Sequence, residues 1–201
     1  MSADFWNTRY RESEPVYGTE PNAFLASEAN RFRPHGSVLC LGEGEGRNAV
    51  FLASQGMEVT ALDYAEAGLE RTGALAASRG VAVGLVHADL STYELSPASF
   101  DAIVAIFVHL PPPLRTKVHR AVLRALRPGG VFLAEYFSKD QLHFSSGGPK
   151  DPSLLYTVDD VREDFGSATI ERLEQVEVDL REGRYHQGRA SVIRVVVSQE
   201  A

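Results

Sequence analysis

Residues 38–48 read Val-Leu-Cys-Leu-Gly-Glu-Gly-Glu-Gly-Arg-Asn, in which a short apolar run enters a turn with three glycines. Glycine adopts positive φ angles easily and lets the backbone approach a ligand closely. In a sheet of parallel strands, a turn of this kind lies at the carboxyl end of a strand, where ligands bind. The stretch therefore predicts a buried strand, a ligand-binding turn and the first turn of a helix.

The segments downstream of this turn alternate between strand and helix patterns. Strands are predicted over residues 37–41, 58–62, 81–86, 100–108 and 131–136, and helices over residues 47–55, 65–79 and 114–126. Strands that alternate with helices of these lengths indicate βαβ units and a parallel sheet. Between the last helix and the last strand, Arg127-Pro128-Gly129-Gly130 is interpreted as a turn.

The last part of the chain has a different pattern. One more helix is predicted over residues 156–165, and two strand-like segments, 170–180 and 190–197, are joined by a polar stretch at 181–189. Two consecutive strands joined in this way form an antiparallel hairpin. We therefore predict an α/β fold, a doubly wound, mostly parallel Rossmann-like sheet of about seven strands that ends in an antiparallel hairpin, with helices on both faces.

The domain prediction is a single domain over residues 1–201, a length that suffices for one sizeable core. Residues 1–35 are expected to form an N-terminal helical arm or lid, with a short helix over 22–32. Residues 36–136 form the core units, and residues 137–201 form an insert on the substrate side, a helix and the terminal hairpin.

Composition excludes several classes of protein. The formal net charge is -7 and the basic residues are scattered, which argues against nucleic-acid binding. The longest apolar run, 102–110, is too short to span a bilayer, and the first residues lack the apolar stretch of a signal peptide. We therefore expect a cytoplasmic protein, a monomer or homodimer, that acts on a small molecule. Cys40 is the only cysteine, so neither a disulfide within the chain nor a metal site is expected.

The identity of the cofactor depends on the charges of the glycine turn. Asp63 follows the second predicted strand, where a carboxylate can accept both hydroxyls of a ribose, and this arrangement suits a dinucleotide or S-adenosylmethionine (SAM). The spacing is G-x-G-x-G, and Glu43 and Glu45 would repel a pyrophosphate, whereas SAM is cationic. SAM is therefore favoured over a nicotinamide cofactor. An ordinary glycine-rich turn without a ligand is the remaining alternative.

These motifs resemble those of class I SAM-dependent methyltransferases, and among them the small tellurite-resistance-type and thiopurine-type enzymes. The similarity covers roughly residues 5–165. It lies in the glycine stretch 39–48, in Glu-Val-Thr-Ala-Leu-Asp at 58–63, in His-Ala-Asp-Leu at 87–90, in Phe-Asp-Ala-Ile-Val at 100–104, and in Leu-Arg-Pro-Gly-Gly-Val at 126–131.

The resemblance implies which residues bind SAM. The glycines would pack on its methionine and ribose parts, Asp63 would bind the ribose, and Tyr64, Asp89 and Leu90 would surround the adenine. Many relatives have an acidic residue where this chain has Cys40, so Glu43 is the candidate contact to the methionine ammonium group. The expected cofactor residues are Gly42, Glu43, Gly44, Gly46, Asn48, Asp63, Tyr64, Asp89, Leu90 and Ile106.

Methyl transfer from SAM is an in-line displacement, so positioning alone supplies much of the rate. A base is needed only when the acceptor carries a proton at the attacking atom. The ends of the fourth and fifth strands offer no carboxylate–histidine pair, only His109, Glu135 and Tyr136, which we expect to shape the pocket. A soft sulfur, selenium or tellurium nucleophile would need no base.

The expected substrate side consists of aromatic and histidine residues from separate parts of the chain. His109 is the candidate catalytic residue, with a structural role before three prolines as the alternative. His186 is interpreted mainly as a solvated loop residue, and the aromatic residues of the arm either cover the cofactor or only pack the arm. The candidates are Trp6, Tyr10, Tyr17, His109, Tyr136 and His186. The leading hypothesis is methyl transfer to a small molecule, and the alternatives are a non-catalytic SAM-binding protein and a nicotinamide-dependent oxidoreductase.

Overall fold

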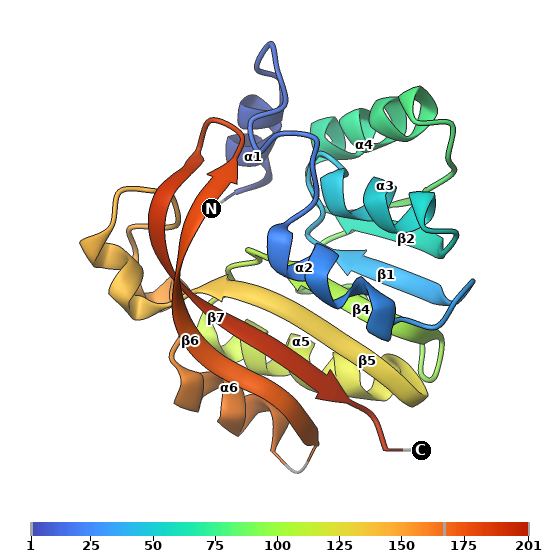
Figure 1. The fold of residues 1–201 in the computed structure, drawn as a ribbon, viewed down its shortest axis with the longest axis vertical. Coiled ribbons are helices and arrows are strands. Elements are labelled where there is room, and N and C mark those ends of the chain that lie inside the picture. Colours follow the sequence, from blue (N-terminus) through green and yellow to red (C-terminus); the bar gives the residue numbers. More distant parts are fainter. Residues whose placement is uncertain (1, 167, 201) are drawn as a thin grey trace.

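The computed structural model describes residues 2–166 and 168–200, which form a seven-stranded sheet in the order β3-β2-β1-β4-β5-β7-β6 (Figure 1). The strands β1 to β5 are parallel, and β7 is antiparallel to both β5 and β6. The strands are β1 Ser37–Leu41, β2 Glu58–Asp63, β3 Gly84–His87, β4 Phe100–Ile106, β5 Leu126–Phe137, β6 Thr169–Glu182 and β7 His186–Ser198. The predicted fold class, including the terminal hairpin, is confirmed.

Helices cover both faces of this sheet (Figure 1). One buried cluster joins α5 and α6 to the strands, and a second joins α2, α3 and α4 to the opposite face. The α-helices are α1 Ala3–Tyr10, α2 Ala23–Glu28, α3 Arg47–Ser54, α4 Glu66–Ser78, α5 Pro112–Ala125 and α6 Val158–Phe165. The 3-10 helices are η1 Ala29–Arg31, η2 Lys139–His143 and η3 Pro152–Leu154.

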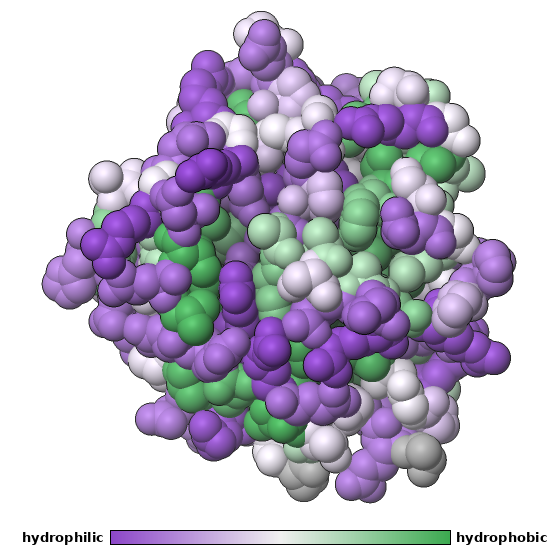
Figure 2. Space-filling view, in the orientation of Figure 1, coloured by the Kyte–Doolittle hydropathy of each residue, from purple (hydrophilic) through white to green (hydrophobic). Residues whose placement is uncertain are grey.

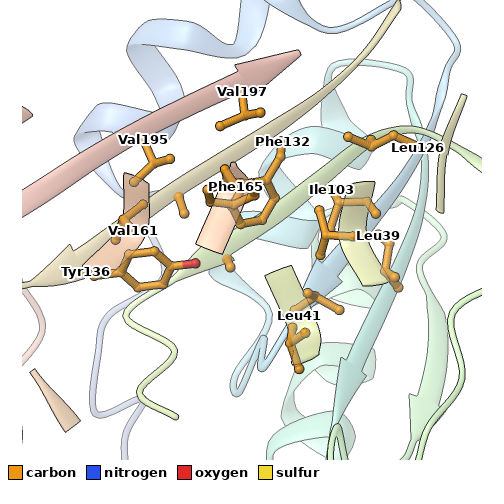
Figure 3. Close-up of a cluster of buried hydrophobic side chains, with 14 of the residues drawn as sticks. Leu39, Leu41, Ile103, Leu126, Phe132, Tyr136, Val161, Phe165, Val195 and Val197 are labelled. Carbon is orange, nitrogen blue, oxygen red and sulfur yellow. The ribbon is translucent and has the colours of Figure 1, made fainter. Parts of the chain in front are cut away.

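The strand β1 is buried on both sides after its first residue, which explains why residues 38–41 are all apolar. Leu39 and Leu41 belong to the cluster that includes α5 and α6, drawn in Figure 3. Val38 and Cys40 point to the other face and pack with α2 and α3. Burial also raises the pKa of the Cys40 thiol, as expected of a structural cysteine rather than a nucleophile.

The boundaries differ from the prediction where polar residues belong to strands. The hairpin has a turn of only 183–185, because β6 includes residues 181–182 and β7 includes residues 186–189 of the polar stretch that suggested a long loop. The predicted turn at 127–130 lies within β5, where the pairing with β4 shifts register. In contrast, α6 ends at Phe165 as predicted and begins two residues later than predicted, after Thr157, with a capping box that pairs Thr157 and Asp160.

Figure 2 shows that hydrophilic side chains cover most of the rim of this face, whereas apolar side chains gather towards its middle. Within the described ranges, no helix is both long enough and apolar enough to cross a membrane.

Candidate functional site

A cavity of about 600 Å³ lies at the carboxyl ends of the parallel strands, where the sequence predicted a site. This volume is within the range of pockets that hold small organic ligands. Its walls come from α1, from the turns after β1 and β2, and from the loops after β3, β4 and β5. Tyr185 and His186, at the tip of the β6–β7 hairpin, also line it.

Most of the predicted cofactor residues line this cavity. They are Gly42, Glu43, Asn48, Asp63, Tyr64, Asp89, Leu90 and Ile106. The two other glycines do not line it. A Cβ atom on Gly44 would lie 2.6 Å from Oη of Tyr10, and one on Gly46 would lie 2.7 Å from Thr72 of α4. Both glycines have positive φ angles, so they allow close packing of the turn rather than contact with a ligand.

Asp63 is held rigidly at the end of β2. Its Oδ2 accepts a hydrogen bond from the Gly44 backbone N at 2.8 Å, and its Oδ1 accepts one from the Ala65 N at 2.8 Å. Burial raises the pKa of this carboxyl group, although the backbone N–H groups act in the opposite direction. The side chain thus positions the glycine turn, and its contact with a ribose stays a prediction.

The two acidic residues of the turn have different partners. Glu43 Oε1 accepts hydrogen bonds from the backbone N atoms of Asn48 at 3.0 Å and Ala49 at 2.7 Å, at the start of α3. Burial outweighs these bonds and raises the pKa of Glu43 to about 7. Glu45 Oε2 accepts from the Val16 N at 2.8 Å and the Tyr17 N at 3.3 Å. Glu45 therefore attaches the N-terminal arm to the glycine turn.

Arg47 lines the cavity, a role that the sequence analysis missed. Its side chain is 7% exposed and its Nη2 donates to Glu182 Oε2 at 2.8 Å. Its Nη1 is buried and has no hydrogen-bond partner among the described residues. A carboxylate would satisfy this donor, and the methionine part of SAM carries one. The only sequence signal was its place directly after the last glycine of the turn.

The aromatic residues predicted in the arm lie over the cavity. Trp6, Tyr10 and Tyr17 all line it, and the rings of Trp6 and Tyr10 stack with centroids 5.4 Å apart. The Arg9 guanidinium donates to the Tyr17 hydroxyl at 3.1 Å and lies 4.4 Å from the Tyr185 ring centroid. The arm and the hairpin tip therefore form one continuous wall.

His109 faces the same cavity from the loop after β4. Its Nδ1 lies 2.9 Å from the Leu154 backbone oxygen, so Nδ1 carries the proton and donates it. Burial lowers the pKa of His109 to about 4, so the ring is neutral at pH 7. Nε2 is buried and has no partner among the described residues.

His186 is not the solvated loop residue that we expected. It is 6% exposed and lines the cavity, with its ring centroid 4.6 Å from that of Tyr17 and 4.7 Å from that of Phe107. Its Nδ1 lies 3.3 Å from Glu182 Oε2. The reason is the short hairpin turn, which brings His186 into β7 instead of a loop.

Tyr136 was also predicted on the substrate side, and this is wrong. It packs in the core cluster of α5 and α6 (Figure 3), and its hydroxyl lies 3.0 Å from His119 Nε2. Glu135 does not line the cavity either; its carboxylate accepts from Asn22 Nδ2 at 2.7 Å. Phe137, which we did not single out, contributes the aromatic wall at this end of β5.

The described part of the chain contains no group of three or more histidine, cysteine, aspartate or glutamate residues that could hold a metal ion. The loop after β5 reaches the cavity through residues 147–150, as expected of the insert in this region.

Comparison with known proteins agrees with this geometry. A family model described as a methyltransferase domain matches residues 38–130. The 2-heptyl-1-hydroxyquinolin-4(1H)-one methyltransferase of Mycobacteroides abscessus is 30% identical over 154 residues, which cover 71% of this chain and 68% of the relative.

Solved structures share the fold at low sequence identity. A SAM-dependent methyltransferase from Methanosarcina mazei has a TM-score of 0.72 at 17% identity, covering 90% of this chain and 99% of the other. TehB from Haemophilus influenzae has a TM-score of 0.74 at 16% identity, covering 98% and 67%. Together with the curated relative, the glycine turn and the cavity, these findings show that the chain belongs to the class I SAM-dependent methyltransferases, with SAM as its cofactor.

Proposed function

We propose that this enzyme methylates a small, flat aromatic molecule at a heteroatom. The observation that carries this proposal is the aromatic wall next to the cofactor residues. The rings of Phe107 and Phe137 stack with centroids 4.4 Å apart, and the His109 ring is parallel to Phe137 at 5.5 Å. A wall of stacked rings favours a flat aromatic ligand over a hydrated inorganic anion.

The curated relative supports the same class of acceptor. By its name, that protein methylates 2-heptyl-1-hydroxyquinolin-4(1H)-one, a bicyclic aromatic compound with a hydroxyl group. The sulfur, selenium or tellurium nucleophile suggested by the sequence is a different chemical class, and one experiment distinguishes the two.

The test measures S-adenosylhomocysteine by mass spectrometry after incubation with SAM and a panel of acceptors. The panel contains hydroxyquinolines, simple phenols, aliphatic and aromatic thiols, selenite and tellurite. We expect the highest kcat/KM for a hydroxylated bicyclic aromatic compound. Turnover of only inorganic oxyanions or aliphatic thiols would contradict the proposal.

A variant connects turnover to the aromatic wall. Phe137→Leu keeps an apolar side chain but removes the ring that stacks on Phe107. We expect a higher KM for the aromatic acceptor, while the Kd of SAM is unchanged. The matched control is Phe132→Leu, which changes a core phenylalanine that does not line the cavity.

A further inference from the structure

Glu182 and His186 form a carboxylate–histidine pair, of which His186 lines the cavity. Glu182 ends β6 and His186 begins β7, so the hairpin turn at 183–185 brings them together. His186 Nδ1 lies 3.3 Å from Glu182 Oε2, and the side chains are 8% and 9% exposed. No such pair could be recognised at the ends of the fourth and fifth strands, because these residues come from the sixth and seventh.

The Glu182 carboxylate is fixed from two further sides. Arg47 Nη2 donates to Oε2 at 2.8 Å, and Asn22 Nδ2 donates to Oε1 at 2.9 Å. Burial acts to raise the pKa of Glu182, but the hydrogen bond from His186 and the Arg47 guanidinium outweigh it and hold the pKa at about 2. The carboxylate is therefore ionised at every pH at which an enzyme of this kind is assayed.

This carboxylate decides the tautomer of the imidazole. An ionised carboxylate only accepts hydrogen bonds, so the proton of neutral His186 lies on Nδ1 and the lone pair on Nε2. Among the described residues, the hydrogen bond of this ring is the one from Nδ1 to Glu182. A Cβ atom on Gly147 would lie 2.7 Å from His186 Cδ2 and 3.4 Å from Nε2, so this edge of the ring faces the cavity loop at 147–150.

The position of the ring places it beside the acceptor. It is edge-on to Phe107, with centroids 4.7 Å apart, and to Phe137, with centroids 5.3 Å apart. These two residues form the wall on which the acceptor stacks in the proposed function. An acceptor that stacks on this wall, as in the proposed function, would have the imidazole at its edge.

We propose that His186 is the general base of the reaction and that Glu182 is its positioning residue, so that the acceptor enters as a protonated hydroxyl compound. This inference rests on the proposed function and adds the protonation state of the acceptor. The lone pair of Nε2 takes the hydroxyl proton while the acceptor oxygen forms a bond to the methyl carbon. The carbon–sulfur bond breaks and its electron pair stays on sulfur, which gives S-adenosylhomocysteine. The proton leaves His186 for solvent when the products depart.

The charge balance of the pocket suits this step. SAM carries one positive charge on sulfur, and the transfer removes that charge from the cofactor. The same step creates one positive charge on the imidazole, next to the Glu182 carboxylate. The net charge inside the closed pocket does not change, and the new charge has a partner in place.

Several groups set the pH at which His186 is active. Burial lowers its pKa, the hydrogen bond from Nδ1 to Glu182 raises it, and the charges of Arg47 and Arg9 lower it again. His109 faces the same space as a neutral ring. The Tyr17 ring lies beside it, and burial raises the pKa of that phenol, so it is neutral too. The base is therefore unprotonated at pH 7, and kcat/KM falls only as the pH drops below the ordinary histidine range.

The first experiment compares two acceptors of different acidity. A hydroxyquinoline whose hydroxyl is protonated at neutral pH needs a base, whereas thiophenol is largely a thiolate near pH 8 and needs none. His186→Asn is expected to lower kcat for the hydroxyquinoline about 10²–10⁴-fold and to change the rate with thiophenol less than about tenfold. Equal losses with both acceptors, or no loss with either, would refute the role of base.

Two variants separate a base from a structural residue. Glu182→Gln removes the charge that supports the imidazolium, so the acidic limb of kcat/KM moves to lower pH and the plateau falls. His109→Asn, which changes the other histidine that packs on Phe137, keeps the acidic limb where it was. S-adenosylhomocysteine affinity and Tm of each variant show whether the fold is intact. These profiles are measured for the acceptor at saturating SAM, so that the pH dependence of SAM binding does not enter. Under that condition, an acidic limb that survives in His186→Asn would overturn the proposal.

The second experiment needs no turnover. With ¹⁵N-labelled histidine, NMR reports the tautomer of each ring, and His186→Asn assigns the His186 signals. Because burial lowers the pKa of His186, we expect a neutral ring protonated on Nδ1 at pH 7 and above, in the free protein and with S-adenosylhomocysteine. A ring protonated on Nε2, or an imidazolium at pH 7, would refute the inference. The result holds whether or not any acceptor of the panel is methylated.

Discussion

The raised pKa of Glu43 predicts that SAM binding depends on pH. Glu43 lines the cavity, and burial raises its pKa to about 7 from an ordinary value of 4.5. A bound cation stabilises the ionised carboxylate, so SAM lowers the pKa again and a proton is released. If the pKa returns to its ordinary value, the Kd of SAM increases about twentyfold between pH 7.5 and pH 5.5.

The assay is isothermal titration calorimetry at pH 5.5, 6.5 and 7.5 in two buffers of different ionisation enthalpy. At pH 6.5 a carboxyl group of pKa about 7 is mostly protonated, so binding releases about three-quarters of a proton. Glu43→Gln keeps an oxygen for the two amides of α3 but has no charge. We expect this variant to bind SAM weakly at every pH and to release no proton.

The same variant tests the sign of the effect on stability. The pKa of Glu43 in the folded protein is above its value in the unfolded chain. The contribution of protonated Glu43 to the free energy of unfolding is therefore lost as the pH rises from 4.5 towards 7. Without SAM, Glu43→Gln is therefore more stable than wild type at pH 7.5, by up to about 3 kcal/mol, and equally stable at low pH. Glu58→Gln, at an exposed position, is the control.

For SAM binding, a Kd that is constant from pH 5.5 to 7.5 would refute the reasoning. The same dependence of Kd on pH in Glu43→Gln as in the wild type would refute it too.

Three further substitutions test other parts of the site. Asp63→Ala should weaken SAM binding at least tenfold by calorimetry, because each charge-assisted bond to the ribose contributes roughly 1.5–3 kcal/mol; an unchanged Kd would place the ribose elsewhere. Tyr136→Phe removes the hydroxyl next to His119 and should lower the free energy of unfolding by about 1 kcal/mol, while a change in the Kd of SAM would contradict its place in the core. Gly148→Ala brings a Cβ atom to 2.9 Å from the Phe137 ring, at a residue with a positive φ angle. The KM of the acceptor should therefore rise while the Kd of SAM is unaltered, and separate binding assays with SAM and with the acceptor measure the two effects.

The sequence was sufficient to predict the parallel core, and most of the residues predicted to bind the cofactor line one cavity. The reason is local: the apolar strands, the glycine turn and Asp63 each carry their signal within a few residues, and the topology of βαβ units then brings the strand ends together. The family resemblance added Asp89 and Leu90, which indeed line the cavity.

The acceptor side could not be predicted in the same way. Tyr136 and Phe137 are neighbours on β5, and a strand sends them to opposite faces, so the prediction depended on a register that the sequence does not define. His186 joins the site only because β6 and β7 extend to residues 182 and 186. Arg47 and Glu182, 135 positions apart, meet through tertiary packing alone.

The contact between the arm and the hairpin tip has a consequence for the exchange of product and cofactor. The Arg184 N donates to the Val16 oxygen at 2.9 Å, and a Cβ atom on Gly183 would lie 2.4 Å from the backbone of Tyr17, so the two segments meet backbone to backbone. We expect S-adenosylhomocysteine to bind beneath this contact, so that it leaves only after the segments separate. We therefore expect its release, rather than methyl transfer, to limit steady-state turnover, visible as a burst of methylated product in the first cycle. Gly183→Ala, which pushes the segments apart, should abolish the burst. A linear first cycle in the wild type would show that separation of the arm and the hairpin tip does not limit turnover.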